Sequence, residues 1–149
     1  MRIIAIITLW NNNLEYKMVV EERIYVLHTW ASLREYLDVY EHEGLTVQIP
    51  ILGGFLGYFV TEFGRQNQLV HLWGYNNLED RKQRREQLAL NEQWQSCLKK
   101  IRPMIRTMEN RIMYPTNFSP IGGDIESFTR INNGSSVDTV LDRISSIRQ

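Results

Sequence analysis

The sequence has very little cysteine, and this limits how the fold can be held together. Cys97 is the only cysteine among 149 residues. A single thiol cannot form a disulfide within the chain, so folding does not depend on an oxidising compartment. No other cysteine or histidine lies near Cys97 in the sequence, which argues against a metal site there. We therefore expect Cys97 to be a packed thiol.

Long apolar runs and an excess of charge of one sign are also missing. Lysine plus arginine number 17 and aspartate plus glutamate number 17, so the formal net charge is zero. A balanced charge gives no general reason to expect nucleic acid or an acidic membrane as a partner. No apolar run approaches the roughly 20 residues that a membrane-spanning helix needs. We expect neither a nucleic-acid partner nor a membrane span.

Motifs of common cofactor and catalytic sites are absent as well. The sequence contains neither GxxxxGK[ST] nor GxSxG. His28 and His42 lack the spacing of metal ligands to another histidine or cysteine. We expect no cofactor and no metal, and the sequence leaves open whether the protein is an enzyme.

The first 17 residues stand apart from the rest. MRIIAIITLW has one arginine before a short apolar run, as a signal peptide does, but NNNLEYK follows without a small-residue cleavage site. We interpret this stretch as an extra edge strand or as an extension before a start at Met18. The expected location is cytoplasmic.

Segments with the residue pattern of strands alternate along the chain with segments of helical spacing, and this order predicts a single α+β domain. Segments 19–28, 54–64, 67–75 and 109–114 are rich in β-branched and aromatic residues and predict strands. Apolar residues at helical spacing predict a first helix that begins at Leu33 and ends at Gly44. A second helical region begins at Leu78 and is broken near Asn91. Asn77 is the expected N-cap of the second helix. The order β-α-β-β-α-β is ferredoxin-like: an antiparallel sheet with helices on one face and a bare opposite face.

Seven blocks in this order resemble the NIPSNAP domain family: EERIYVL (21–27), EYLDVYEHEG (35–44), LGYFVTEFG (56–64), NQLVHLWGY (67–75), DRKQRREQL (80–88), KIRPM (100–104) and ENRIMYPTNFSP (109–120). The resemblance covers a domain at 18–120, leaving extensions at 1–17 and 121–149, the second with a short helix predicted after Ser135. It implies a dimeric α/β barrel, in which two sheets pair bare face to bare face around a cavity. It supplies no reaction.

The predicted strand NQLVHLWGY carries the main candidate site. Side chains alternate along a strand, so Leu69, His71, Trp73 and Tyr75 share one face, which we expect to be the bare one. Usual hairpin pairing adds Tyr58 to that face. The rings either pack at a dimer interface or line a small-molecule cavity. In the second case His71 is the candidate catalytic residue, because imidazole exchanges protons near neutral pH.

Neighbouring strands and a basic helix supply further candidates. Arg23, Tyr25, Glu109 and Arg111 are potential neighbours of the rings, but their facing is not fixed by the sequence. DRKQRRE (80–86) either forms a solvated helix face, or captures phosphate or carboxylate at a cavity mouth through Arg81 and Arg85, or binds nucleic acid. The last is disfavoured, because no aromatic residues are interleaved there.

Together these features predict a homodimer with a cavity for a small, partly apolar or anionic molecule. The ligand-binding candidates are Tyr58, His71, Trp73, Tyr75, Arg81 and Arg85. Two alternatives stay open: a cofactor-independent monooxygenase or isomerase of the dimeric α/β-barrel type, and an interaction module without catalysis. A cavity with converging polar groups favours a ligand binder or an enzyme over an interaction module.

Overall fold

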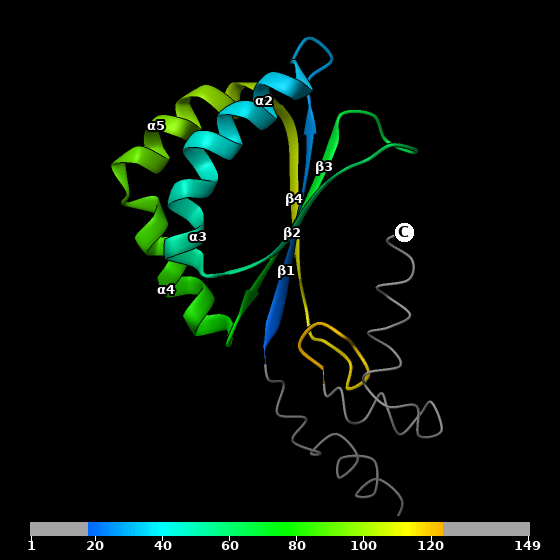
Figure 1. Cartoon of the computed structure of the whole chain (residues 1–149), viewed down its shortest axis with the longest axis vertical. Helices are drawn as coiled ribbons and strands as arrows, with labels where there is room; N and C mark the ends of the chain where they lie inside the picture. Colours follow the sequence, from blue (N-terminus) through cyan, green and yellow to red (C-terminus); the bar gives the residue numbers. More distant parts are fainter. Residues whose placement is uncertain (1–17, 124–149) are drawn as a thin grey trace, which may run out of the picture.

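A computed structural model describes residues 18–123 of the chain. Four strands form one antiparallel sheet in the order β2-β3-β1-β4. Their bounds are Val19–Leu27 for β1, Gly54–Val60 for β2, Gln68–Tyr75 for β3 and Ile105–Met113 for β4. The helices lie together on one side of the sheet, as Figure 1 shows. The predicted α+β, ferredoxin-like architecture is confirmed.

The first helical segment is longer than the sequence pattern indicated. It runs through α2 (Leu33–Val39), the π-helix η1 (Tyr40–Leu45) and α3 (Thr46–Leu52), and ends at Gly53, whose φ is 81°. The predicted end at Gly44 is wrong. A Cβ at Gly44 would lie 3.1 Å from the Tyr40 ring and 3.4 Å from Cys97 Sγ. Gly44 therefore serves close packing against α5 (Glu92–Ile101) and does not terminate the helix.

The second helical segment follows the prediction closely. Asn77 caps α4 (Leu78–Ala89), its side-chain oxygen accepting the Asp80 backbone N–H at 2.8 Å. The break near Asn91 is confirmed, because Asn91 caps α5 in the same way through the Trp94 backbone N–H. After α5 a short 3-10 turn, Arg102–Met104, leads into β4, which begins earlier than the predicted strand.

The core lies between the helices and the sheet. Its buried side chains come from every layer, and Cys97 is completely buried among them, as expected of a packed thiol. The opposite side of the sheet carries no helix within residues 18–123 (Figure 1). None of the helices in that range is long and apolar enough to cross a bilayer.

Candidate functional site

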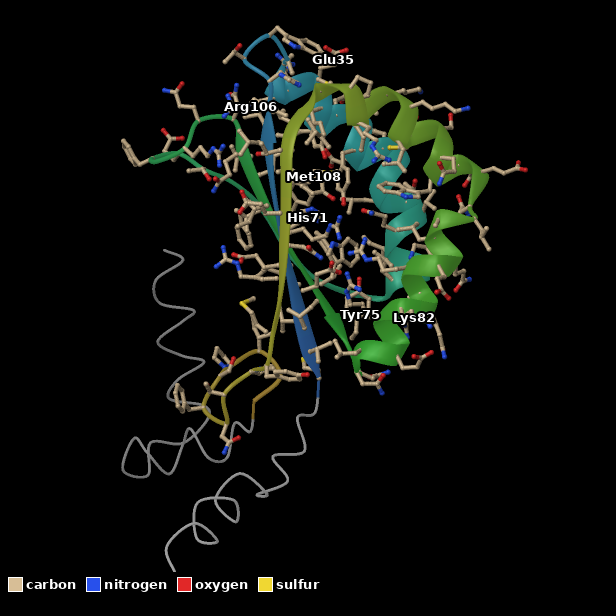
Figure 2. All side chains as sticks on the ribbon, turned by 180° about the vertical axis from the view of Figure 1, so that it is seen from behind. Glu35, His71, Tyr75, Lys82, Arg106 and Met108 are labelled. Carbon is tan, nitrogen blue, oxygen red and sulfur yellow. The ribbon has the colours of Figure 1, made fainter. Side chains whose placement is uncertain are left out.

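The ring-bearing face of β3 points into the protein and not away from it. Leu69, His71, Trp73 and Tyr75 are each at most 3% exposed, and Figure 2 shows the labelled Tyr75 between the sheet and the helices. The His71 ring packs against Tyr40 of η1 on the same side. The prediction that they lie on the bare face is wrong. Strand periodicity shows which side chains share a face, but it does not show which face the helices cover. A cavity between two bare faces would therefore not be lined by these rings.

His71 is held as a neutral imidazole. The Trp73 indole N–H donates a hydrogen bond to His71 Nδ1 at 3.0 Å. Because an indole nitrogen only donates, Nδ1 must accept and the imidazole proton lies on Nε2. Burial, followed by the nearby charges of Arg23 and Arg85, lowers the pKa of His71 to about 3. These surroundings disfavour the proton exchange proposed for His71 near neutral pH.

Three tyrosine rings surround this imidazole. The ring centroids of Tyr58, Tyr25 and Tyr40 lie 4.7, 4.9 and 6.2 Å from that of His71. Tyr40 comes from η1, and its hydroxyl donates to the buried Gln48 of α3. Burial raises the pKa of both Tyr40 and Tyr58, so their hydroxyls stay protonated. His71 Nε2 has no hydrogen-bond partner in the described residues.

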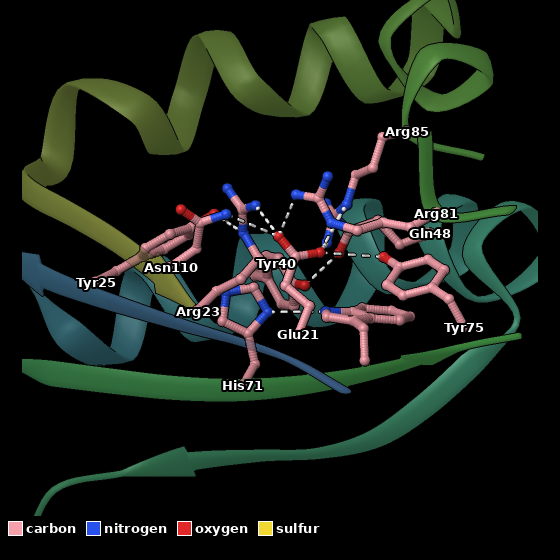
Figure 3. A network of polar contacts seen from close by, with 11 residues as sticks. Glu21, Arg23, Tyr25, Tyr40, Gln48, His71, Tyr75, Arg81, Arg85 and Asn110 are labelled. Atoms are coloured by element: carbon pink, nitrogen blue, oxygen red, sulfur yellow. Dashed lines mark hydrogen bonds and ion pairs between the residues drawn. The ribbon is translucent and has the colours of Figure 1, made fainter. Parts of the chain in front are cut away.

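A buried carboxylate organises the polar half of the site (Figure 3). Glu21 on β1 is fully buried, and three guanidinium groups reach it from two elements. The Arg23 Nη1, Arg81 Nη2 and Arg85 Nη2 atoms lie 2.8, 2.7 and 2.8 Å from its oxygens. Asn110 of β4 and Tyr75 of β3 also donate to it, at 3.1 and 3.4 Å. The cluster ties α4 to three strands.

The charges in this cluster do not balance. Burial alone would raise the pKa of Glu21, but the hydrogen bond from Arg81 and the charges of Arg85 and Arg23 lower it to about 2. Glu21 is therefore ionised at neutral pH. Among the described residues no other carboxylate forms an ion pair with these three arginines. Among residues 18–123 the cluster therefore pairs three cations with one anion, an excess of two positive charges within it.

A cleft of about 370 Å³ opens beside the cluster, between α4, α5 and the strands β1 and β4. One side presents Arg23, Tyr25 and Arg85, and Arg102 lies at the end of α5. Most of the remaining wall is apolar: Leu88, Ala89, Trp94, Leu98, Ile101, Ile105 and Met108. No carboxylate side chain lines it within the described range. An apolar cleft with a few converging polar groups is the usual form of a small-molecule site.

The structure separates the predicted ligand-binding residues into two groups. His71 and Trp73 are buried and Tyr58 is partly buried against the core, whereas Tyr75, Arg81 and Arg85 bind Glu21. Of these, only Arg85 lines the cleft. Arg81 and Arg85 do not form a solvated helix face, because they point into the protein toward Glu21 (Figure 3).

Residues on β1 and β4 complete the site. Arg23 and Tyr25 face the rings, as the register of β1 against β3 requires. Arg111 instead pairs with Glu22 on the opposite face, where Glu109 also lies by register. The sequence interpretation did not include Glu21 or Asn110. The alternation of Glu21, Arg23 and Tyr25 along β1 was the available signal, since these side chains must share a face.

The family model and the curated relatives that match this chain all belong to one family. A family model described as NIPSNAP matches residues 20–120. Protein NipSnap of Drosophila melanogaster is 39% identical over 66 residues, covering 44% of this chain and 24% of that protein. Protein NipSnap homolog 1 of Danio rerio is 35% identical over 66 residues, again covering 44% and 24%. The match thus spans about a quarter of the length of these curated relatives.

Solved structures agree with the sequence match. A NIPSNAP family protein from Agrobacterium tumefaciens is 45% identical, with a TM-score of 0.67 over 70% of this chain and 98% of that one. An uncharacterized NIPSNAP-like domain protein from Burkholderia xenovorans is 46% identical, with a TM-score of 0.67 over 70% and 90%. A putative antibiotic biosynthesis monooxygenase from Nitrosomonas europaea, 9% identical with a TM-score of 0.51 over 66% and 90%, shares the fold alone.

Proposed function

Because the chain belongs to the NIPSNAP family, we propose that it is a homodimeric protein that binds a small, partly apolar molecule in the cleft between its helices and its sheet. The observation that carries this proposal is the cleft itself. Its volume of about 370 Å³ suits a small organic molecule, and its wall combines apolar side chains with Arg23, Arg85 and Arg102. Glu21 holds two of these arginines in fixed positions.

Binding is better supported than acid–base catalysis. A general acid or base works best when its pKa lies near the working pH. Burial moves the pKa of His71 down to about 3 and that of Tyr58 well above its usual range. Both groups are therefore locked in their uncharged forms at neutral pH. This disfavours an isomerase or oxygenase that relies on proton transfer by these residues.

The homodimer is supported by the sheet face opposite the helices. Ile24, Val70 and Leu72 come together there by register, and none of them is fully buried in the single chain. Phe59, which pairs with Val70, is 54% exposed. Contiguous apolar surface of this kind is usually covered by association, and a second copy of the same face gives a closed, symmetric solution.

The proposed domain is residues 18–120, between extensions at 1–17 and 121–149 that lie largely outside the described residues. The family match at 20–120 supports these limits. The helix predicted after Ser135 also falls outside the described range. We further propose a cytoplasmic location, consistent with a core in which the single thiol, Cys97, is buried and unpaired.

Blocking the cleft tests the proposed binding function. Met108 is partly exposed on its wall, so Met108→Trp should fill the opening without disturbing the core. Leu90→Trp is the matched control, because Leu90 is exposed between α4 and α5 and does not line the cleft. Native mass spectrometry of protein purified from its own host should detect a bound small molecule in the wild type and in Leu90→Trp.

The same measurement on Met108→Trp should show the molecule lost, with an unchanged circular dichroism spectrum. Retention of the molecule by a folded Met108→Trp protein would place binding elsewhere. Purification of the wild type without any small molecule, together with no melting-temperature change in a screen of organic compounds, would contradict the proposal as a whole.

A further inference from the structure

The cleft carries an uneven distribution of charge that indicates the class of its ligand. Arg23 and Arg85 line it on one side, Arg102 adds a third cation, and no acidic side chain of the described chain lines it. Glu21 lies behind Arg23 and Arg85, fully buried, and it is shared with Arg81. One carboxylate cannot neutralise three guanidinium groups, so the polar side of the cleft keeps a positive charge.

Arg23 and Arg85 have guanidinium N–H donors that Glu21 does not use. Arg23 uses Nη1 for Glu21 and Nε for the Tyr25 hydroxyl. Arg85 uses Nε and Nη2 for Glu21. Each guanidinium group has further N–H donors beyond these, and planar carboxylates match their geometry. Glu21 thus positions the two groups and leaves donors available for a second anion.

The rest of the wall is suited to a chain or ring of carbon atoms. Trp94, Leu98, Ile101, Ile105 and Met108 continue from the arginines along α5 and β4. A ligand that meets both parts must have an anionic end and an apolar body. Resting on the proposed binding function, we propose that the cleft takes an organic carboxylate, with its head group on Arg23 and Arg85 and its apolar tail against α5 and β4.

Three probes with one chain length test the charge requirement. Decanoate, decanol and decylammonium, kept below micelle-forming concentrations, present the same tail with a negative, neutral or positive head. Isothermal titration calorimetry on the full chain should give decanoate at least about tenfold tighter binding than decanol, because charge-assisted hydrogen bonds exceed neutral ones. Decylammonium should not bind. Raising the salt concentration should weaken the binding of decanoate and leave the binding of decanol nearly unchanged.

Two variants assign the effect to the arginines. Arg85→Gln leaves Glu21 paired with Arg23 and Arg81. It should weaken the binding of decanoate about tenfold while the binding of decanol is retained. Arg102→Gln removes an exposed cation of the cleft that does not contact Glu21, and should weaken the binding of decanoate less than Arg85→Gln does. Lys82→Gln is the control, since Lys82 lies exposed on α4 (Figure 2) and does not line the cleft, and the substitution removes the same charge. Its decanoate affinity should match the wild type.

The outcomes separate this inference from the function on which it rests. Equal affinity for decanoate and decanol, with both lost in Met108→Trp, would overturn the carboxylate inference and keep the cleft as a binding site. A decanoate affinity that is insensitive to both arginine variants would also overturn it. Failure of all three probes to bind, each at the highest concentration at which it stays dissolved, would count against the carboxylate ligand and the cleft together.

Discussion

The Trp73 indole N–H donates to His71 Nδ1 at 3.0 Å, and this one contact fixes the state of the imidazole. A protonated His71 would present an N–H at Nδ1 toward another N–H, so the contact is compatible only with the neutral ring. Burial acts in the same direction and lowers the pKa of His71 to about 3. His71 is thus a buried hydrogen-bonding residue with its free donor at Nε2.

We predict a loss of stability in mild acid that comes from His71. The ordinary pKa of 6.5 in the unfolded chain exceeds the folded value of about 3, so only the unfolded chain takes up this proton between those limits. The free energy of unfolding should be highest above pH 6.5 and fall at about 1.4 kcal/mol per pH unit below it. Urea denaturation at closely spaced pH values measures this slope.

Two histidine variants test whether His71 causes the loss of stability in mild acid. His71→Phe should be less stable at neutral pH, because the Trp73 indole loses its acceptor, but should show a flatter pH dependence between pH 6.5 and 4.5. His42→Gln replaces an exposed histidine whose pKa is raised by the backbone carbonyl of Asp38, so its own contribution to stability changes mainly at and above pH 6.5. Between pH 6 and pH 4.5 this variant should keep the wild-type slope. An unchanged slope in His71→Phe would show that other groups cause the acid sensitivity.

The Glu21 cluster predicts a large difference between two adjacent glutamates. Glu21→Gln leaves three half-buried arginines without their counter-charge, and should cost about 3–5 kcal/mol of unfolding free energy at pH 7. Glu22→Gln removes only a pair with the exposed Arg111, on the other face, and should cost less than about 1 kcal/mol. Urea denaturation of both variants checks this, and equal losses would contradict the structural role assigned to Glu21.

The same cluster predicts a second acid transition. Glu21 has a folded pKa of about 2 against an ordinary 4.5, so its contribution to stability is complete above pH 4.5 and is lost as the pH falls toward 2. The wild type should lose stability over this range in addition to the change due to His71. Glu21→Gln should lack this additional loss, as urea denaturation between pH 4.5 and pH 3 would show.

The sequence was sufficient for the fold because local signals agreed with one another. Asn77 and Asn91 mark helix starts through capping chemistry that needs only neighbouring residues. The strands were visible from alternation and from β-branched residues. Gly44 was misread because a glycine can end a helix or allow close packing, and only the position of Cys97 distinguishes the two.

The candidate site was less accessible to sequence reasoning. Period-two alternation correctly grouped Tyr58 with His71 and Trp73. It did not show whether the helices cover that group, since this depends on the direction in which the chain crosses the sheet. The partners of Glu21 are separated from it by 60 residues for Arg81 and 89 for Asn110, so only the folded chain brings them together.

A close backbone approach predicts unequal effects for two glycines of β2. A Cβ at Gly54 would lie 2.1 Å from the carbonyl oxygen of Gly74 on β3, which is backbone and cannot turn away. Gly54→Ala should therefore cost at least about 2 kcal/mol. A Cβ at Gly57 would meet only the exposed Phe59 ring, at 2.7 Å, so Gly57→Ala should cost less than about 1 kcal/mol. Thermal denaturation followed by circular dichroism ranks the two, and the reverse order would contradict the register of β2 on β3.

The open sheet face yields the last prediction, which concerns assembly. Phe59 is 54% exposed on that face beside Val70, whereas Phe63 is 91% exposed beyond the end of β2. If two copies pair through their open faces, Phe59→Ser removes apolar contact from the interface and Phe63→Ser does not. Sedimentation velocity over a dilution series should show a wild-type dimer, a dissociation constant raised at least about tenfold in Phe59→Ser, and no change in Phe63→Ser. Leu72→Glu, which places a charge at the centre of the same face, should give a folded monomer. A wild type that stays monomeric at every concentration would contradict the homodimer, and loss of the dimer in Phe63→Ser alone would move its interface to the connection between β2 and β3.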